Sequence, residues 1–519
     1  MARAIVQIPN NGRWTRIIIG KMGVNHVEDA MRTIRSLSLT CLVLTFLLIG
    51  RQSPAATEAP LVLTHVTIID VAGGRAQPDR TVVISGGRIA AIDASSRVAV
   101  VKGSRIVDAT GKFLIPGLWD AHVHLANIIV PNWARAVSLP LLVANGITGV
   151  RDMGGSFEEI KALRKEIADG MLPGPHIIAA GPQLGGAGKE QEIPDMWLAS
   201  NNAEAGRHSV IAQKRAGVDF IKIQSLVPRD AYFAIVSEAK HQGLSFVGHV
   251  PELISAVEAS DAGQRSMEHS MGIWQSCSSS ETELRSSMTE ALRDLKTTPQ
   301  YVFRRVEFGL PPRGTLETFN DEKASQLFER FVRNGTWQVP TLVEEQSFAL
   351  LVSNGLMDQR GMSFVPMLML KQWDLPNILI PLSEEDRKDL GKIVPMMLDV
   401  VGRMHRAGVR ILAGTDMPWL VVPGFSLHGE LILLVKAGFS PAEALRSATL
   451  DTAEFLGLQN SLGSVETGKL ADMVLLDANP LDDIHNTQRI NGVLLQGRYY
   501  NRRSLDALLQ KVKAEASEH

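Results

Sequence analysis

The chain has 519 residues, of which 53 are Lys or Arg and 55 are Asp or Glu, so its formal net charge is −2. A near-neutral charge offers no long-range attraction to nucleic acid, and we expect no nucleic-acid partner. The length exceeds that of a single small core and indicates one large domain with appendages, or two to three domains. With 45% hydrophobic and 21% charged residues, the composition is that of an ordinary globular protein.

The N-terminal part has the pattern of an export signal. Arg32 and Arg35 precede a short apolar run, residues 36–50 ("SLSLTCLVLTFLLIG"), and small residues suited to cleavage follow it. The run is shorter than the ~20 apolar residues of a membrane span. We therefore expect residues 1–56 to be an N-terminal extension and signal peptide, with Met31 a candidate true start. The mature protein would be secreted or periplasmic without stable membrane insertion, and an uncleaved anchor is the alternative.

Cysteine use limits what can stabilise the fold. The sequence contains two cysteines, Cys41 inside the apolar run and Cys277. If the run is removed, Cys277 has no intrachain partner for a disulfide, so the fold must depend on its core. We interpret Cys277 as structural or incidental.

Short strand signals separated by turns mark both ends of the chain. Examples are "LVLTHVTIID" and "RTVVISGGRIAAID" near the start, and "ADMVLLDAN" and "INGVLLQGRYYN" near the end. We expect residues 57–115 and 465–503 to pair into one small β-sandwich domain. Residues 504–519 are predicted to form a helix that docks on its own protein through an apolar stripe of Leu505, Leu508, Leu509 and Val512.

The middle of the chain, residues 116–464, alternates strand and helix signals. Eight strands separated by helices predict an α/β fold, a (β/α)8 TIM barrel, in which chemistry takes place at the C-terminal ends of the strands. Two long insertions follow the sixth and seventh strands, at about 276–335 and 344–399. The second is rich in Met and Trp and is either a packed helical layer or an apolar lid over the site. The eight candidate strands are "FLIPGLWDAHVHL", "GITGVRDM", "GPHIIAAG", "VDFIKIQ", "LSFVGHV", "RSMEHSM", "TWQVPTLV" and "VRILAGTD".

Metal-ligating residue types end four of these strands. His122 and His124 are two positions apart in "DAHVH", so they project from the same face of the first strand and can chelate one ion. His249 ends the fifth strand, His269 the sixth and Asp416 the eighth. Each alone could be a hydrogen-bonded core histidine or a helix cap. Their common position at strand ends favours a metal site.

Lys222 lies among apolar residues in "VDFIKIQS". Strand alternation places it on the face that points into the barrel, where burial disfavours its protonated form. A neutral amine can add carbon dioxide and become a carbamate, which can bridge two divalent ions ~3.5–4 Å apart. The alternative is a lysine that extends to the barrel mouth or pairs with Asp416.

The ordered motifs "IPGLWDAHVHL", "DFIKI", "FVGHV", "EHSM", "AGTD", "SPAEALRSATLDTAEFLGL" and "GSVETGKLADMVLLDANP" resemble the amidohydrolase superfamily. The similarity is greatest to its imidazolonepropionase-like and Xaa-Pro or Xaa-Arg dipeptidase-like branch, and it spans about residues 61–500. The resemblance implies two divalent metal ions, with zinc the first choice and manganese or cobalt as alternatives. It implies that the more buried ion is held by His122, His124 and Asp416, the second by His249 and His269, and that carboxylated Lys222 bridges them.

One segment departs from this resemblance. Relatives often carry Gly-Gly-His after the third strand, whereas this chain reads "GPQLGGAGKEQE", with Ala187 and Lys189 nearby and no His. A substrate contact there would be altered. We therefore do not assign to this chain the substrate of any one relative.

The expected reaction is hydrolysis of a C–N amide bond in a small molecule, a dipeptide or an N-acyl amino acid. A metal-bridging hydroxide would attack the carbonyl, and Asp416 would pass a proton to the leaving amine. Arg229, Tyr232 and His428 are candidate substrate contacts. The alternatives are hydrolysis of a cyclic amide, imide or lactone, imidazolonepropionase-type chemistry, and a non-catalytic barrel relative. A homo-oligomer is compatible with the sequence.

Overall fold

The chain divides into two compact units, Met1–Glu58 and Ala59–His519. In the first unit, β1 (Ile5–Asn10) and β2 (Arg13–Ile18) form an antiparallel hairpin. The predicted signal segment, residues 36–50, lies outside the described residues. The computed structural model describes residues 5–10, 13–18, 59–98, 102–126, 130, 132–185, 195–293, 311, 314–354, 361–373 and 384–518.

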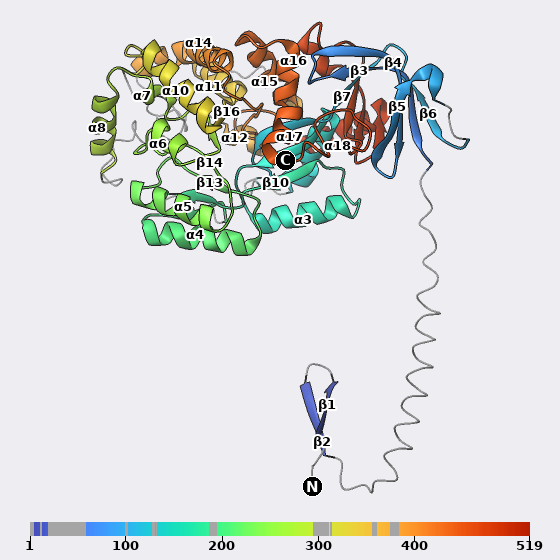
Figure 1. The fold of residues 1–519 in the computed structure, drawn as a ribbon, viewed down its shortest axis with the longest axis horizontal. Helices are drawn as coiled ribbons and strands as arrows, with labels where there is room; N and C mark the ends of the chain where they lie inside the picture. Colours follow the sequence, from blue (N-terminus) through green and yellow to red (C-terminus); the bar gives the residue numbers. More distant parts are fainter. Residues whose placement is uncertain are drawn as a thin grey trace. The chain divides into compact units, whose positions relative to one another are not determined.

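Parallel strands occupy the middle of the second unit (Figure 1). They form one sheet in the order β10-β9-β8 and another in the order β12-β11-β13-β14-β15-β16. Two isolated parallel bridges, Val123 to Met417 and Gln338 to Ile411, connect both sheets to the segment that contains Asp416. Seven of the eight predicted strands are therefore present as strands, and the eighth makes bridges only. The strands are β8 (Leu118–Val123), β9 (Ile147–Asp152), β10 (His176–Ala179), β11 (Gln183–Gly185), β12 (Trp197–Ala199), β13 (Ile221–Ile223), β14 (Phe246–Gly248), β15 (Ser266–Glu268) and β16 (Trp337–Val339).

Helices follow most of these strands. Figure 1 shows α3, α4 and α5 on one side of the parallel strands and α10, α11 and α14 on the other. The α-helices of this region are α2 (Leu139–Ala144), α3 (Phe157–Ala168), α4 (Ala203–Ala216), α5 (Arg229–His241), α6 (Ala256–Asp261), α7 (Ile273–Ser276), α8 (Glu281–Ala291), α10 (Asp321–Asn334), α11 (Leu342–Asn354), α12 (Met367–Gln372), α14 (Glu384–Arg406), α15 (Phe425–Lys436), α16 (Pro441–Ser447) and α17 (Leu450–Leu456). Short irregular helices are η1 (Ser95–Arg97), η2 (Trp133–Ser138), η3 (Met362–Phe364) and η4 (Ile484–Gln488).

Local sequence signals explain where these helices begin and end, and α10 is the clearest case. Its N-cap, Asn320, accepts a hydrogen bond from the backbone N–H of Lys323, and its C-cap, Gly335, has a φ of 65°. Both features are typical of helix ends. The buried residues recur at helical spacing and give the helix one apolar face. They are Ala324, Leu327, Phe328 and Phe331.

Strands from the two ends of the chain share a third sheet. Its order is β19-β18-β17-β7-β3-β4-β5, with β6 paired to β3. The join is antiparallel between β7 and β17, where Ile115 lies opposite Val474. The predicted pairing of the two ends is confirmed, and the β-sandwich stays a prediction. The strands are β3 (Leu61–Asp70), β4 (Arg75–Ser85), β5 (Arg88–Ala94), β6 (Arg105–Asp108), β7 (Phe113–Pro116), β17 (Met473–Leu476), β18 (Ile490–Leu495) and β19 (Arg498–Asn501).

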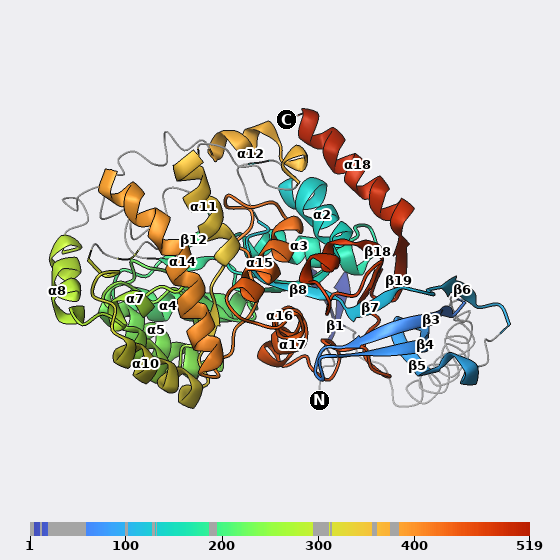
Figure 2. The same cartoon turned by 90° about the horizontal axis from the view of Figure 1, so that it is seen from above.

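The C-terminal helix α18 (Arg502–Glu518) docks on its own protein as predicted. Leu505 and Val512 are buried, and Leu508 and Leu509 pack against the main apolar cluster. Figure 2 shows α18 beside α2. Its apolar stripe is therefore covered within the chain.

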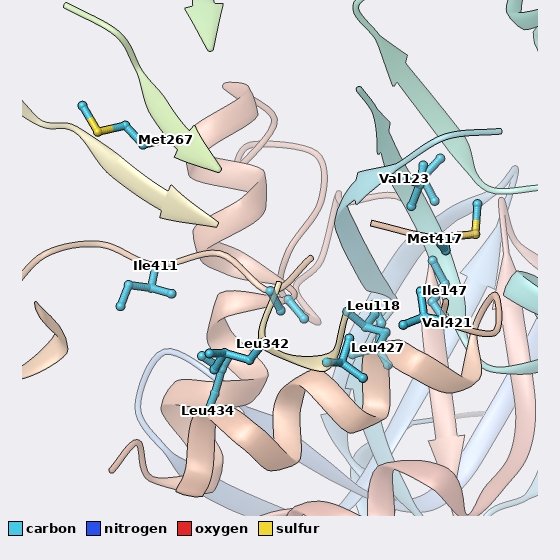
Figure 3. Packing of buried hydrophobic residues seen from close by; sticks show 14 of the residues in the cluster. Leu118, Val123, Ile147, Met267, Leu342, Ile411, Met417, Val421, Leu427 and Leu434 are labelled. Atoms are coloured by element: carbon cyan, nitrogen blue, oxygen red, sulfur yellow. The ribbon is translucent and has the colours of Figure 1, made fainter. Parts of the chain in front are cut away.

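The main core lies between the parallel strands and the helices around them (Figure 3). Leu118 and Ile147 come from strands, whereas Leu427 and Leu434 come from α15. Cys277 is a buried free cysteine, in agreement with the structural interpretation. Within the part of the chain that the structure describes, no helix combines the length and apolar character needed to cross a membrane.

Candidate metal centre

The C-terminal ends of four parallel strands supply most of the predicted ligands. His122 belongs to β8, and His124 follows that strand by one residue. Lys222 is the middle residue of β13. His249 and His269 each come directly after a strand, β14 and β15. Parallel strands point their carboxyl ends to the same side, so these side chains converge.

Asp416 lies at the centre of this group. Its Oδ1 atom is 3.1 Å from His122 Nε2 and also 3.1 Å from His124 Nε2. Its Oδ2 atom is 3.9 Å from His269 Nε2. The fourth imidazole, that of His249, packs against the His269 ring, with the two ring centroids 5.0 Å apart. The structure thus brings together all four predicted histidines and the aspartate.

Each of the four imidazoles is oriented by a hydrogen bond at Nδ1. With Nδ1 donating, the Nε2 lone pair stays available to a metal ion, which is the usual arrangement at such centres. The four acceptors are Glu268 Oε2 for His122 at 3.0 Å, the Gly154 carbonyl for His124 at 2.8 Å, Ser225 Oγ for His249 at 2.6 Å and Thr341 Oγ1 for His269 at 2.8 Å.

Lys222 is fully buried, and its Nζ atom has no hydrogen-bond partner. Burial lowers the pKa of its ammonium group to about 8, while the negative charges of Glu268 and Asp416 oppose this shift. His122 Nε2 and Asp416 Oδ1 are also buried without a hydrogen bond. Burying an imidazole, a carboxylate and an amine without hydrogen-bond partners destabilises the fold unless a ligand binds to them. The donor set therefore fits a divalent cation such as zinc.

The charges in the cluster shift the pKa values of its members. Burial alone would raise the pKa of Asp416, but the neighbouring histidines hold it well below its usual range. Burial lowers the pKa of His269 to about 3 and that of His249 well below its usual range. These two imidazoles are neutral at pH 7, which is the form that binds metal.

An ion pair that sequence reasoning missed lies beneath the cluster. Arg151 Nη2 is 2.9 Å from Glu268 Oε2, and both side chains are buried. Glu268 also accepts the hydrogen bond from His122, so Arg151 acts on the imidazole through the carboxylate. Glu268 is the last residue of β15, and Arg151 is the second-last residue of β9. In the sequence, only this position near a strand end pointed to them.

Replacing Arg151 by methionine is expected to destabilise the metal-free protein by about 3–5 kcal/mol, because it leaves the buried Glu268 carboxylate without a counter-charge. Urea unfolding measures this change. The matched control is Arg293→Met, which breaks an exposed pair with Glu290 on the surface of the protein and should change stability little. Equal stability of the two variants would contradict the prediction.

The segment that carries Asp416 is held tightly against β8. The Asp120 carboxylate accepts hydrogen bonds from Thr415 Oγ1 at 2.6 Å and from the Thr415 backbone N–H at 3.0 Å. A Cβ atom on Gly414 would lie 2.7 Å from Val339 Cγ1 and 2.9 Å from His122 Cβ. Glycine is needed there because the segment passes so close to the histidine.

Backbone strain is concentrated at the same strand ends. His269, Thr341 and Asp416 have φ values of 58°, 48° and 59°, in the left-handed region. Such conformations cost of order 1–3 kcal/mol each and cluster at functional sites. The strain supports the view that these positions were selected for the site.

A further carboxylate, Glu344, was missed by sequence reasoning. Three potential ligand atoms lie within 4.8 Å of one another, one each from Glu344, His269 and Asp416. Burial raises the pKa of Glu344 well above its usual range, and the charges of Glu345 and Asp416 act in the same direction. In the sequence this residue reads as an ordinary acidic residue in the first turn of a helix, α11.

In the structure the three predicted substrate contacts, Arg229, Tyr232 and His428, each contact another part of the chain, and their role stays a prediction. Arg229 pairs with Glu258. Tyr232 is fully buried and donates its hydroxyl hydrogen bond to Gln264. His428 is buried between Thr487 Oγ1 at 2.9 Å and the Asn145 carbonyl at 3.1 Å. Their burial or pairing could not be seen in local sequence.

The second insertion packs next to Asp416. In α12, Met369 and the following Trp373 are buried, and Trp373 Nε1 donates a hydrogen bond to the Pro418 carbonyl at 3.1 Å. Met367, at the start of the helix, is 54% exposed. The insertion is thus anchored two residues from the catalytic candidate. Ala187 and Lys189, at the Gly-Gly-His departure, lie outside the described residues.

Comparisons with known proteins agree with this geometry. Residues 350–499 match the Amidohydrolase family. The chain is 24% identical over 483 residues to ochratoxinase from Aspergillus niger, covering 82% of this chain and 83% of that protein. It is 23% identical over 435 residues to imidazolonepropionase from Pseudomonas putida, covering 80% and 92%. A solved putative prolidase from Bifidobacterium longum superposes with a TM-score of 0.61 at 26% identity, covering 88% and 99%.

Proposed function

We propose that this chain, which contains an amidohydrolase family domain and is a hydrolase of carbon–nitrogen bonds, uses two metal ions to cleave the amide bond of a dipeptide or an N-acyl amino acid. The observation that carries the proposal is the meeting of four oriented imidazoles with Asp416 and the buried, unpartnered amine of Lys222. An isolated hydrogen-bonded histidine would not leave its Nε2 atom unsatisfied beside a carboxylate.

The ligand assignment follows from the contacts. His122 and His124 share one oxygen of Asp416 and would hold the first ion. His249 and His269 would hold the second. Lys222, once converted to a carbamate, would exchange a buried cation for an anionic group with two oxygen ligands. Its depressed pKa favours the neutral amine that this conversion needs.

When bound, the two ions would supply a water of lowered pKa and polarise the scissile carbonyl. Asp416 can accept the proton of the attacking water and deliver it to the leaving amine, because its ionised carboxylate lies among the ligands. Glu268 and Arg151 keep the His122 ring in one orientation during this transfer. The chain's own contribution is positioning and proton transfer.

The substrate class is supported by the relatives named above and by the insertion beside the site. Two of the proteins to which the chain is similar are ochratoxinase and a putative prolidase. Met369 and Trp373 of α12 place apolar mass next to the Asp416 segment, so an apolar acyl or side-chain group is favoured. The similarity to imidazolonepropionase supports imidazolonepropionase-type chemistry as the rival.

The architecture proposed with this function is a closed (β/α)8 barrel over residues 116–464. It is supported by the bridges at Val123 and Gln338. A backbone hydrogen bond of 3.0 Å from Asp219 N–H to the Ala179 carbonyl also links β10, at the edge of one parallel sheet, to the residues just before β13 of the other. Residues 57–115 and 465–503 would form the β-sandwich domain, where a second apolar cluster gathers side chains from both ends. Residues 1–56 would direct export.

The test is a screen of purified protein, supplied with zinc and bicarbonate, against dipeptides, N-acyl amino acids, lactones and cyclic amides, with metal content measured in parallel. The proposal expects two ions per chain and hydrolysis of members of the first two classes. One ion per chain, with activity only on cyclic amides, would establish the imidazolonepropionase-type rival instead.

A further inference from the structure

The first turn of α11 places a carboxylate at the edge of the metal centre. Ligand atoms of Glu344, His269 and Asp416 all lie within 4.8 Å of one another. Two ligand atoms bonded to one zinc-type ion at ~2.0–2.2 Å can be at most about 4.4 Å apart. A movement of a few tenths of an ångström therefore allows Glu344 and His269 to bind the same ion.

The backbone around Glu344 is held from two directions. Thr341, just before the helix, is hydrogen-bonded through Oγ1 to His269 Nδ1 at 2.8 Å. The backbone N–H of Val343 donates to Glu430 Oε2 on α15 at 2.8 Å. The same turn therefore orients His269 and carries Glu344, so the distance between these two side chains is set by fixed backbone and not by a mobile loop.

A separate observation shows that this space is built for a ligand. His122 and Lys222 are fully buried, and His122 Nε2 and Lys222 Nζ have no hydrogen-bond partner. Buried polar atoms without partners are rare in proteins and point to a missing ion or ligand. Glu344 is thus a carboxylate beside a group of buried polar atoms without hydrogen bonds, and not a member of a solvated acidic cluster.

We propose that Glu344 is an additional carboxylate ligand of the second metal ion, the one assigned to His249 and His269. This inference rests on the two-ion function proposed above. The second ion would then have an anionic ligand that does not depend on carbamate formation at Lys222. Its retention would depend on α11 and, through the α11 backbone, on Glu430.

The experiment titrates Co²⁺, in the presence of bicarbonate, into the metal-free full-length protein, and follows binding by calorimetry and visible absorption. Glu344→Gln keeps the shape of the side chain and removes its charge. The dissociation constant of the second site is expected to rise by at least about tenfold, with the first site unchanged. The matched control is Glu322→Gln, which removes an exposed acid in the first turn of α10 and is expected to leave both sites as in the wild type.

Thermal unfolding of each metal-free variant checks folding. If Glu344→Gln does not fold, Glu344→Asp is used, since a carboxylate shorter by one methylene should also weaken the second site. If the wild type binds two ions and the variant binds both with unchanged affinity, only the proposed role of Glu344 is overturned. Unchanged affinities with a raised KM for dipeptides would make Glu344 a substrate contact, which also overturns it. Fewer than two ions bound by the wild type would overturn the two-ion function itself.

Discussion

Replacing Lys222 by alanine is expected to weaken binding of the second metal ion and to lower kcat/KM for the best substrate by at least about 10²-fold. The physical reason is that the buried amine is the precursor of the bridging carbamate, and its loss leaves the second ion without that ligand. The wild type should gain activity when bicarbonate is present during metal loading, whereas the variant should not. Metal content and steady-state kinetics measure the two effects.

Lys222→Met separates this role from a structural one. The wild-type amine is buried without a partner, so an apolar side chain of similar length should leave the metal-free protein as stable as before or more stable. Metal affinity should nevertheless fall as it does for alanine. A methionine variant that loses stability but keeps two ions and full activity would show that Lys222 only fills space.

Replacing Asp416 by asparagine is expected to lower kcat by about 10²–10⁴-fold. The amide has nearly the same shape as the carboxylate, but it cannot accept a proton, and it is a weaker partner for His122 and His124, whose Nε2 atoms both lie 3.1 Å from Oδ1. Kinetics are measured on protein loaded with excess metal, so that a loss of affinity is distinguished from a loss of proton transfer.

The matched control is Asp451→Asn. Asp451 is a largely buried aspartate in α17 whose partner is Arg446, through an Nε hydrogen bond of 2.9 Å, and not one of the proposed ligands. The Asp451→Asn substitution should leave kcat unchanged. If the Asp416 variant retained kcat within about tenfold while binding two ions, another group would have to carry the proton.

The positions of the proposed ligands could be inferred from the sequence because they obey local rules. His122 and His124 are two residues apart at the end of one strand, and His249 and His269 directly follow short strands. Strand periodicity and the polarity of a parallel sheet are enough to place such residues on one side of the sheet. The apolar stripe of α18 is a similar local pattern.

The supporting residues could not be inferred in the same way. Arg151 and Glu268 are 117 positions apart and pair only because β9 and β15 face a common interior. Glu344 comes to the site through the fold of α11, and its helical context in the sequence predicts only a first-turn acid. Conversely, Tyr232 looked accessible at the start of a helix, but the fold buries it. Contacts across elements decide these cases, and no local pattern records them.

The central claim is that side chains from separate strands enclose a pair of cations. Crystals of the full-length protein grown with Zn²⁺ and bicarbonate, measured on both sides of the zinc absorption edge, test it most directly. The account predicts two anomalous peaks about 3.5–4 Å apart, one beside His122 and His124 and the other beside His249 and His269, with added density on Lys222 between them. A single peak, or a pair away from these imidazoles with Lys222 unmodified, would contradict it.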